Sequence, residues 1–287
     1  MLKRPILRKK DLTEFVMKRV REFAPAISFE QGEDALTFRL VEPNGDASGW
    51  LWLHNIWHDY QRSGDLNIVI NFINGQIEAM LYMKQMTEQP RGVDIFNVYP
   101  AIRPQNYVND QKEQIGRCFN DASVPGLDTV FVERKEGFLV ILNEDVVKPV
   151  LVYMDENEIK KQAYENLRKR GWVEPEMIIP AMNVEEDGTF HVFHSPGYPF
   201  HHQFLLSDMS SVHLPNSFLV TFPGQYMAVV LTIEGSIQSA LQAKRIAERS
   251  GLIYFAKYAT ASEHRPLSNN IYWVEGNKRY WLKGVKA

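Results

Sequence analysis

The sequence of 287 residues has a single cysteine, Cys118. One thiol cannot form an internal disulfide, and it cannot supply a zinc site built mainly from thiolates. No stretch approaches 18 uninterrupted apolar residues, so the sequence predicts no membrane-spanning helix. We therefore expect a protein of a reducing compartment, the cytoplasm, with its one thiol free and buried or partly buried.

An excess of charge of one sign is also missing, because the formal net charge is only -3. Such a chain has no general field that attracts a polyanion, and nucleic-acid binding would need a local basic patch. The densest basic stretch is the start, "MLKRPILRKK", which lacks the apolar run of about 7 to 15 residues that a secretory signal needs. We interpret it as a basic arm before a helix. The composition argues against nucleic acid as a partner.

Common catalytic motifs are absent as well. The sequence has no G-x-S-x-G nucleophile elbow, no G-x-x-x-x-G-K-[ST] phosphate loop and no G-x-G-x-x-G dinucleotide loop. Cys118 lies in "IGRCFND", without a recognisable catalytic motif around it. The sequence therefore presents no complete catalytic set.

The N-terminal portion is predicted to hold a helix, a hairpin and a long second helix. In "KKDLTEFVMKRVREFAP" apolar residues recur three and four apart and a proline follows, which predicts an amphipathic helix. Two β-favouring runs around Gly32 predict a hairpin. In "SGDLNIVINFINGQIEAMLYMKQM" the pair Asn74-Gly75 is a hairpin signal, but the apolar residues share one helical stripe. We prefer the helix, in which one glycine costs about 1 kcal/mol.

A domain boundary is predicted near residue 90, at "TEQPRGVD". It separates an N-terminal portion, residues 1–90, from a C-terminal portion, residues 91–287. The C-terminal portion begins with the strand "IFNVYPAIRP", followed by a polar stretch to about residue 126.

A hairpin followed by a capped helix is then predicted twice, over residues 128–171 and over residues 217–251. Asp155 and Glu158 have the spacing of a capping box at the start of the first helix. In the second helix four side chains are predicted to face inward: Ile237, Ala240, Leu241 and Ala247. This order predicts an α+β fold, with antiparallel sheets, helices on one face and repeated hairpin-helix units.

The chain resembles the YtpQ-like family of bacterial proteins, which has no established activity. The resemblance is carried over roughly residues 50–255 by the order of "NVYPAIRP", "VERKEGFLVILNED", "MDENEIKKQAYENLRK", "TFHVFHSPGYPFHHQFLL" and "FLVTFPGQYMAVVLT". It rests on element order and apolar pattern, and it implies a cytoplasmic α+β protein of a Gram-positive bacterium. It supplies no catalytic residue. Near "HVFHSPGYPFHHQF" the match lies in "FHVF" and in Gly197-Tyr198, whereas the histidines depart from it.

Four histidines in "HVFHSPGYPFHHQF" are candidate metal ligands: His191, His194, His201 and His202. Imidazoles suit zinc and other divalent metals, so the alternative function is a metal-dependent hydrolase. In a strand, however, His191 and His194 point to opposite faces, and no Asp or Glu lies between Thr189 and Ser207 to orient an imidazole. The competing interpretation is that the histidines are satisfied loop and surface residues and that the protein needs no cofactor.

A second pair of histidines, His54 and His58 in "LHNIWHDY", has the spacing of a zincin helix. The glutamate that acts as general base in zincins is missing, since Asn55 follows the first histidine. The pair is therefore interpreted as the edge of a short aromatic helix.

Aromatic residues concentrate in "GWLWLHNIWHDY", "PGYPFHHQF" and "IYWVEGNKRYW". Tryptophan and tyrosine need partners for their polar ends, so some could line a pocket or a partner surface. Trp57, Tyr198 and Phe200 are the candidate ligand-binding residues. The sequence thus favours a non-enzymatic cytoplasmic binding or adaptor protein that presents an aromatic-lined groove or a sheet edge to a protein or small ligand.

Overall fold

The computed structural model describes the chain in these ranges: residues 8–41, 45, 51–88, 92–121, 124–135, 138–181, 188–195, 197–262 and 267–282. The chain divides into two compact units, and the main division falls after residue 91. The first unit comprises residues 1–91 and 136–138, and the second comprises residues 92–135 and 139–287. None of the described helices combines the length and the apolar composition needed to cross a membrane.

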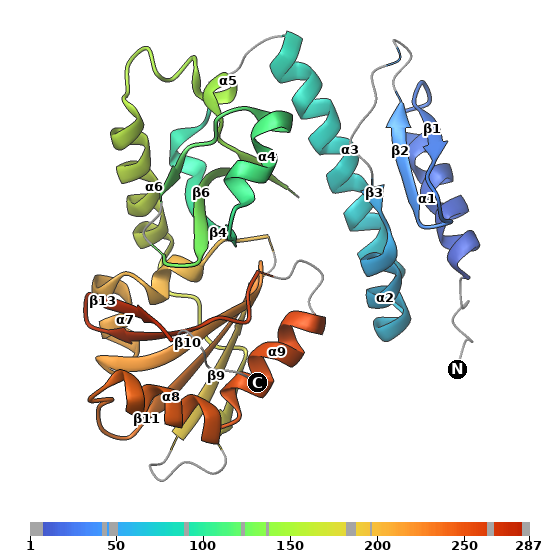
Figure 1. The fold of residues 1–287 in the computed structure, drawn as a ribbon. Helices are drawn as coiled ribbons and strands as arrows, with labels where there is room; N and C mark the ends of the chain where they lie inside the picture. The colour runs from blue at the N-terminus through green and yellow to red at the C-terminus, as the bar shows by residue number, and fades with distance from the viewer. Residues whose placement is uncertain are drawn as a thin grey trace. The chain divides into compact units, whose positions relative to one another are not determined.

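The first unit packs helices against a small antiparallel sheet (Figure 1). Its elements are α1 (Lys9–Phe23), β1 (Ser28–Gln31), β2 (Thr37–Val41), β3 (Leu51–Trp52), α2 (His54–Ser63) and α3 (Leu66–Glu88), with the strands in the order β1-β2-β3. The amphipathic pattern predicted for α1 is confirmed, because Leu12, Val16 and Val20 are buried in the core that α1 shares with the sheet. The hairpin around Gly32 is confirmed as β1 and β2.

The helix preferred over a hairpin at Asn74-Gly75 is also confirmed, because α3 runs through both residues. Its stripe of Val69, Ile73 and Ile77 is buried against α1, α2 and the sheet. Asp65 supports the first turn, since its Oδ1 accepts a hydrogen bond from the backbone N–H of Asn67 at 2.9 Å. Burial of the whole stripe outweighs the cost of one glycine.

The second unit contains two antiparallel sheets. Its strands are β4 (Val98–Pro104), β5 (Asn120–Asp121), β6 (Leu127–Arg134), β7 (Leu139–Ile141), β8 (Met177–Pro180), β9 (Gly188–His194), β10 (Ser217–Gly224), β11 (Met227–Ile233), β12 (Ile271–Glu275) and β13 (Lys278–Trp281). The described strands form a sheet ordered β4-β6-β5, with β7 on β6, and a second sheet ordered β13-β12-β10-β11-β9-β8. The helical elements are η1 (Ile95–Asn97), α4 (Tyr107–Ile115), α5 (Glu144–Val147), α6 (Glu156–Arg170), η2 (His201–Phe204), α7 (Ser207–His213), α8 (Ala240–Arg249) and α9 (Leu252–Ser262).

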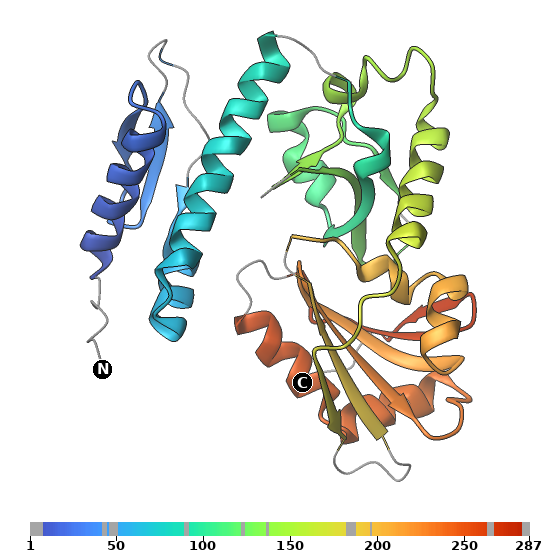
Figure 2. The same cartoon turned by 180° about the vertical axis from the view of Figure 1, so that it is seen from behind.

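Both faces of the larger sheet are covered by other elements. Successive side chains of each strand point to opposite faces, so each strand contributes apolar residues to a core on either side. Leu219 of β10 packs with α8 and α9, which lie on one face of the sheet (Figure 1). Phe218 and Phe222 of the same strand face the opposite core, which includes Phe204 of η2 and Tyr99 of β4. After α6 the chain passes from the smaller sheet to β8 at the edge of the larger one (Figure 2). The second unit is therefore built around a core shared by both sheets.

The α+β class with antiparallel sheets is confirmed. The two predicted hairpins form, as β6 with β7 and as β10 with β11, but they belong to different sheets. Whether each hairpin and its following helix represent a structural repeat stays a prediction.

The capping box predicted for α6 is confirmed. The Asp155 carboxylate accepts from the N–H of Glu158 at 2.9 Å, and the Glu158 carboxylate accepts from the N–H of Asp155 at 2.8 Å. Two N–H groups that would otherwise lack partners are thereby satisfied.

Replacing Asp155 with alanine should lower the free energy of unfolding by about 1 kcal/mol, because one of these N–H groups loses its acceptor. Urea denaturation followed by circular dichroism would measure the change. Asn157→Ala is the matched control, since this exposed residue lies in the same turn and should shift stability by less than about 0.5 kcal/mol. Equal effects of the two substitutions would contradict the capping role.

The inward face predicted for the second capped helix needs correction. α8 begins after Ser239, whose Oγ accepts from the N–H of Gln242 at 3.2 Å, so Ile237 lies before the helix, although its side chain is buried as predicted. Ala240 and Leu241 are exposed, whereas Ala247 is buried as predicted. The buried stripe continues through Ala243 and Ile246. The later start of the helix explains why the predicted stripe was displaced.

Candidate functional site

The two histidines of β9 lie apart from each other. His191 Nε2 is 3.0 Å from Thr232 Oγ1, and burial lowers the pKa of His191. His194 is exposed, and its Nδ1 is 3.5 Å from a carboxylate oxygen of Glu176. Their odd spacing places them on opposite faces of the strand, as predicted.

The other two histidines are buried, which corrects the prediction that they lie on the surface. They form the start of η2, between Phe200 and Phe204. His201 Nε2 is 3.0 Å from the carbonyl oxygen of Gly224, and His202 Nε2 is 3.1 Å from Thr129 Oγ1. Phe200 and Phe204 are buried in the core. Because the two histidines lie between them in the same short helix, burial of the phenylalanines also buries the imidazoles. The imidazoles find polar partners there.

Burial also determines the charge of these two side chains. It lowers the pKa of His201 to about 4 and, with a smaller effect from His201 itself, lowers the pKa of His202 to about 3. Both are therefore neutral at pH 7. Nδ1 of His202 is buried without a hydrogen-bond partner.

The histidines proposed as metal ligands do not converge. His201 is directed at the carbonyl groups of the β10-β11 hairpin and His202 at β6. Among the residues that the structure describes, no three His, Cys, Asp or Glu side chains come together to hold a metal ion. In α2, His54 Nε2 lies 3.3 Å from Asp34 Oδ2 and His58 is exposed. The geometry of these ranges thus adds no support to the hydrolase alternative.

The aromatic candidates lie in cores. Trp57 is buried in the first unit. Tyr198 and Phe200 are buried in the second unit, so the three residues do not share one core. Phe200 stacks on the His201 ring, with centroids 4.8 Å apart, and packs edge-on against Phe204. Their part in ligand binding stays a prediction, but as packed they hold the core together and do not line an open groove.

The loop at Gly197-Tyr198 is nevertheless bordered by charged side chains. Arg134, at the end of β6, donates from Nε to the carbonyl oxygen of Gly197 at 3.3 Å. Arg170, the last residue of α6, places its guanidinium 5.1 Å from the centroid of the Tyr198 ring. Both arginine side chains are exposed. We call Arg134, Arg170, Gly197 and Tyr198 the arginine loop.

A second surface feature is a short apolar turn between α5 and α6. Leu151, Val152 and Tyr153 are 41%, 85% and 68% exposed, although they follow the fully buried Val150. We call residues 151–153 the apolar turn. Three consecutive large apolar side chains held in solvent are unusual on a surface that has no partner.

The edge of the larger sheet is a weaker candidate. Strand β8 exposes Met177 and Ile178 at that edge. Pro180 has no N–H to donate, however, and the strand has only four residues. Short length and proline are features that protect sheet edges from pairing with other strands.

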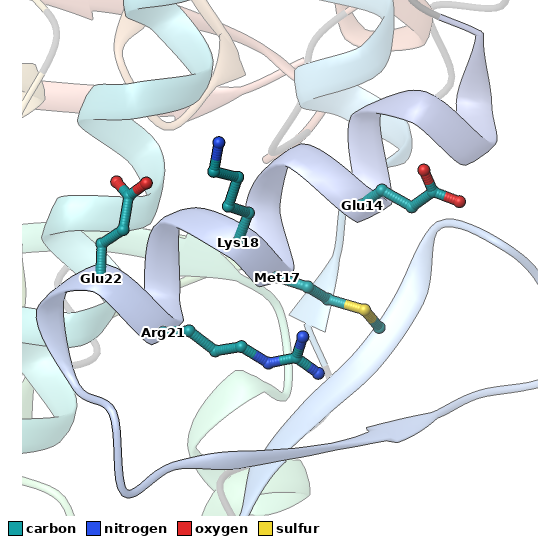
Figure 3. Close-up of a pocket in the computed structure, with 5 residues that line it drawn as sticks. All are labelled: Glu14, Met17, Lys18, Arg21 and Glu22. Atoms are coloured by element: carbon teal, nitrogen blue, oxygen red, sulfur yellow. The ribbon is translucent and has the colours of Figure 1, made fainter.

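In the first unit, a pocket of about 380 Å³ lies along α1 (Figure 3). Its described lining comes from one helix: Glu14, Met17, Lys18, Arg21 and Glu22. In Figure 3 Met17 and Arg21 extend to the same side of the helix, whereas Lys18 and Glu22 point to another side. The Arg21 guanidinium lies 5.4 Å from the Phe29 ring. The lining shows no convergent set of polar groups, which a small-molecule site needs.

The single cysteine is buried in the second unit, as the sequence predicted. Cys118 Sγ lies 3.9 Å from the carbonyl oxygen of Gly116, and burial raises the pKa of the thiol. A buried protonated thiol is a poor nucleophile.

Of the arginine loop, the sequence predicted only Tyr198 as a ligand-binding residue, and it did not predict the apolar turn as a site. Arg134 and Arg170 are distant in sequence, and only the fold brings both to one loop. The turn lies in "KPVLVYMDEN", where an apolar run directly before a capping box was the available signal.

Comparisons with protein-family models, curated proteins and solved structures give no match to this chain. The resemblance to the YtpQ-like family therefore stays a prediction.

Proposed function

We propose that the chain is a non-enzymatic cytoplasmic binding or adaptor protein of the YtpQ-like type, which docks a protein partner through the apolar turn. The observation that carries this proposal is the exposure of Val152, at 85%, next to two further exposed apolar side chains. Burying such side chains against a partner removes apolar surface from water, which is a principal source of binding free energy.

The backbone holds the apolar turn in place. The N–H groups of Tyr153 and Met154 both donate to the carbonyl oxygen of Val150 at 3.0 Å. Val150 is anchored in the interior, and the capping box of α6 fixes the chain from Asp155 onward. Little backbone conformational entropy would be lost in these residues on binding, so the backbone of the turn is preorganised.

The test is a double substitution, Val152→Ser with Tyr153→Ser. Both side chains are exposed, so the fold should be retained while the affinity for a partner falls about tenfold or more. Immobilised full-length protein would be used to retain partners from a lysate of the source cells, and their affinities would then be measured by calorimetry.

Leu241→Ser is the matched control, because Leu241 is 60% exposed on α8, away from the turn in sequence. A partner retained equally by the wild type and the control, and lost by the double variant, supports the proposal. A partner that binds the double variant as well as the wild type would overturn it, as would a failure to retain any partner.

A further inference from the structure

The two guanidinium groups of the arginine loop come from separate elements and meet at one short segment. Arg134 reaches it from the end of β6, and Arg170 reaches it from the C-terminus of α6. Each contacts a neighbouring residue, Gly197 or Tyr198. The segment lies within the second unit, whose core fixes the position of both elements.

Neither arginine has an ion-pair partner among the described residues, unlike Arg117 and Arg168 of the same unit. Several other arginines of the described ranges do lie within 4 Å of a carboxylate: Arg39 with Glu30, Arg117 with Glu144 and Glu156, and Arg168 with Asp208. Two cations at one loop that form no ion pair with the described part of the chain repel each other, and an anion between them would relieve that repulsion.

Tyr198 holds one of the two groups in place. Its ring packs edge-on against Tyr99, with centroids 5.3 Å apart, and its hydroxyl is buried without a hydrogen-bond partner. Burial raises the pKa of Tyr198, and the positive charges of Arg170 and Arg134 oppose that rise. Both guanidinium groups are therefore close enough to act electrostatically on the Tyr198 hydroxyl. A guanidinium over a fixed ring loses little freedom when it then binds a ligand.

The contact of Arg134 leaves most of its donors available. Its Nε is used by the carbonyl oxygen of Gly197, so the two terminal nitrogens remain for a ligand. Gly197 has φ +73, and apart from its two chain neighbours no described residue has an atom within 4 Å of the place where a Cβ would lie, so the loop is open at this point.

We propose that Arg134 and Arg170 form a binding site for a phosphate group, with Tyr198 as a positioning residue for Arg170. A carboxylate can be fully bound by one guanidinium through a bidentate contact. A tetrahedral phosphate dianion has enough oxygens and enough negative charge to bind two guanidinium groups. The site lies on different elements from the apolar turn, so it stands independently of the proposed protein docking.

The test uses full-length protein titrated with inorganic phosphate and, separately, with phenyl phosphate, at constant ionic strength. Saturable binding of either should be seen by calorimetry, and each of Arg134→Gln and Arg170→Gln should weaken it about tenfold or more. Binding of both compounds indicates that free phosphate is sufficient. Binding of phenyl phosphate alone identifies phosphate esters as the ligands.

Further variants separate a binding role from a structural one. Arg245→Gln, at an exposed arginine of α8, should leave binding unchanged. Arg170→Lys should restore only part of the affinity, because an ammonium lacks the planar fork. Melting temperatures without phosphate should be unchanged in the arginine variants. The proposal is overturned if the wild type binds neither compound, if both glutamine variants bind as the wild type does, or if sulfate and chloride stabilise the protein equally well.

Discussion

Lowering the pH from 7 to 5 is expected to destabilise the second unit by about 3 to 4 kcal/mol through His201 and His202. Burial lowers the pKa of these side chains to about 4 and about 3 in the folded protein, against an ordinary value of 6.5. The unfolded chain therefore takes up protons between pH 6.5 and 5 and the folded chain does not. The stability contributed by the neutral imidazoles is complete above pH 6.5 and is lost as the pH falls through about 4 for His201 and about 3 for His202.

The surroundings of the pair explain why protonation is resisted. Among the described residues no carboxylate bonds to either imidazole, and the charges of Arg103 near His201 and of Arg279 near His202 oppose a further positive charge. The carbonyl oxygens of Gly224 and Met227 partly favour the charged form of His201, but burial is the larger effect.

Hydrogen exchange of the amides in β10 and β11, followed by mass spectrometry from pH 7 to 5, would measure this loss within the second unit after correction for intrinsic rates. The double variant His201→Gln, His202→Gln should show a much weaker pH dependence. If this variant does not fold, His202→Gln alone should show about half of the wild-type dependence of stability on pH. His58→Gln, at an exposed histidine of the first unit, is the control and should leave it unchanged. A pH dependence as steep in the double variant as in the wild type would contradict the assignment.

Replacement of Phe200 with alanine is expected to cost about 3 to 5 kcal/mol of unfolding free energy. The ring is fully buried and contacts His201 and Phe204, so its removal leaves a cavity at the centre of the second unit. Phe96→Ala is the control, because Phe96 is 65% exposed and its loss should change stability by less than about 0.5 kcal/mol.

Comparing the stabilities of the two variants in urea tests whether Phe200 acts as a core residue or as a ligand-contacting residue. A large loss of stability in Phe200→Ala agrees with the packing seen here. A variant as stable as Phe96→Ala would show that the ring is dispensable to the core, and the ligand-binding interpretation of Phe200 would then be the better one.

The helices that the sequence predicted correctly have strong local signals. α1 and α3 carry complete apolar stripes, and α6 carries both halves of a capping box. α4 was read as part of a polar stretch, because it begins after Asn106 in a left-handed conformation, with φ +70, and without a side-chain cap. Local patterns therefore identify helices that are amphipathic or capped, and they miss a short polar one.

The candidate sites depend on contacts that no local pattern encodes. The burial of His201 is completed by carbonyl groups of Gly224 and Met227, more than 20 residues later in the chain. Arg134 and Arg170 become neighbours only because β6 and α6 end beside the same loop. Residue type and spacing indicated which histidines and aromatic residues were candidates for ligand binding. Whether a ligand could reach them depends on their burial, which the local sequence does not show.

The burial of the lone thiol offers a practical way to observe binding. Cys118 is enclosed and its pKa is raised, so maleimide reagents at neutral pH should leave the native protein unlabelled. A single new cysteine at Tyr153 or at Lys169, the exposed neighbour of Arg170, would then carry a fluorophore at one defined position, with no need to remove the native one. Each surface could be followed in its own labelled protein, one against candidate proteins and the other against phosphate compounds.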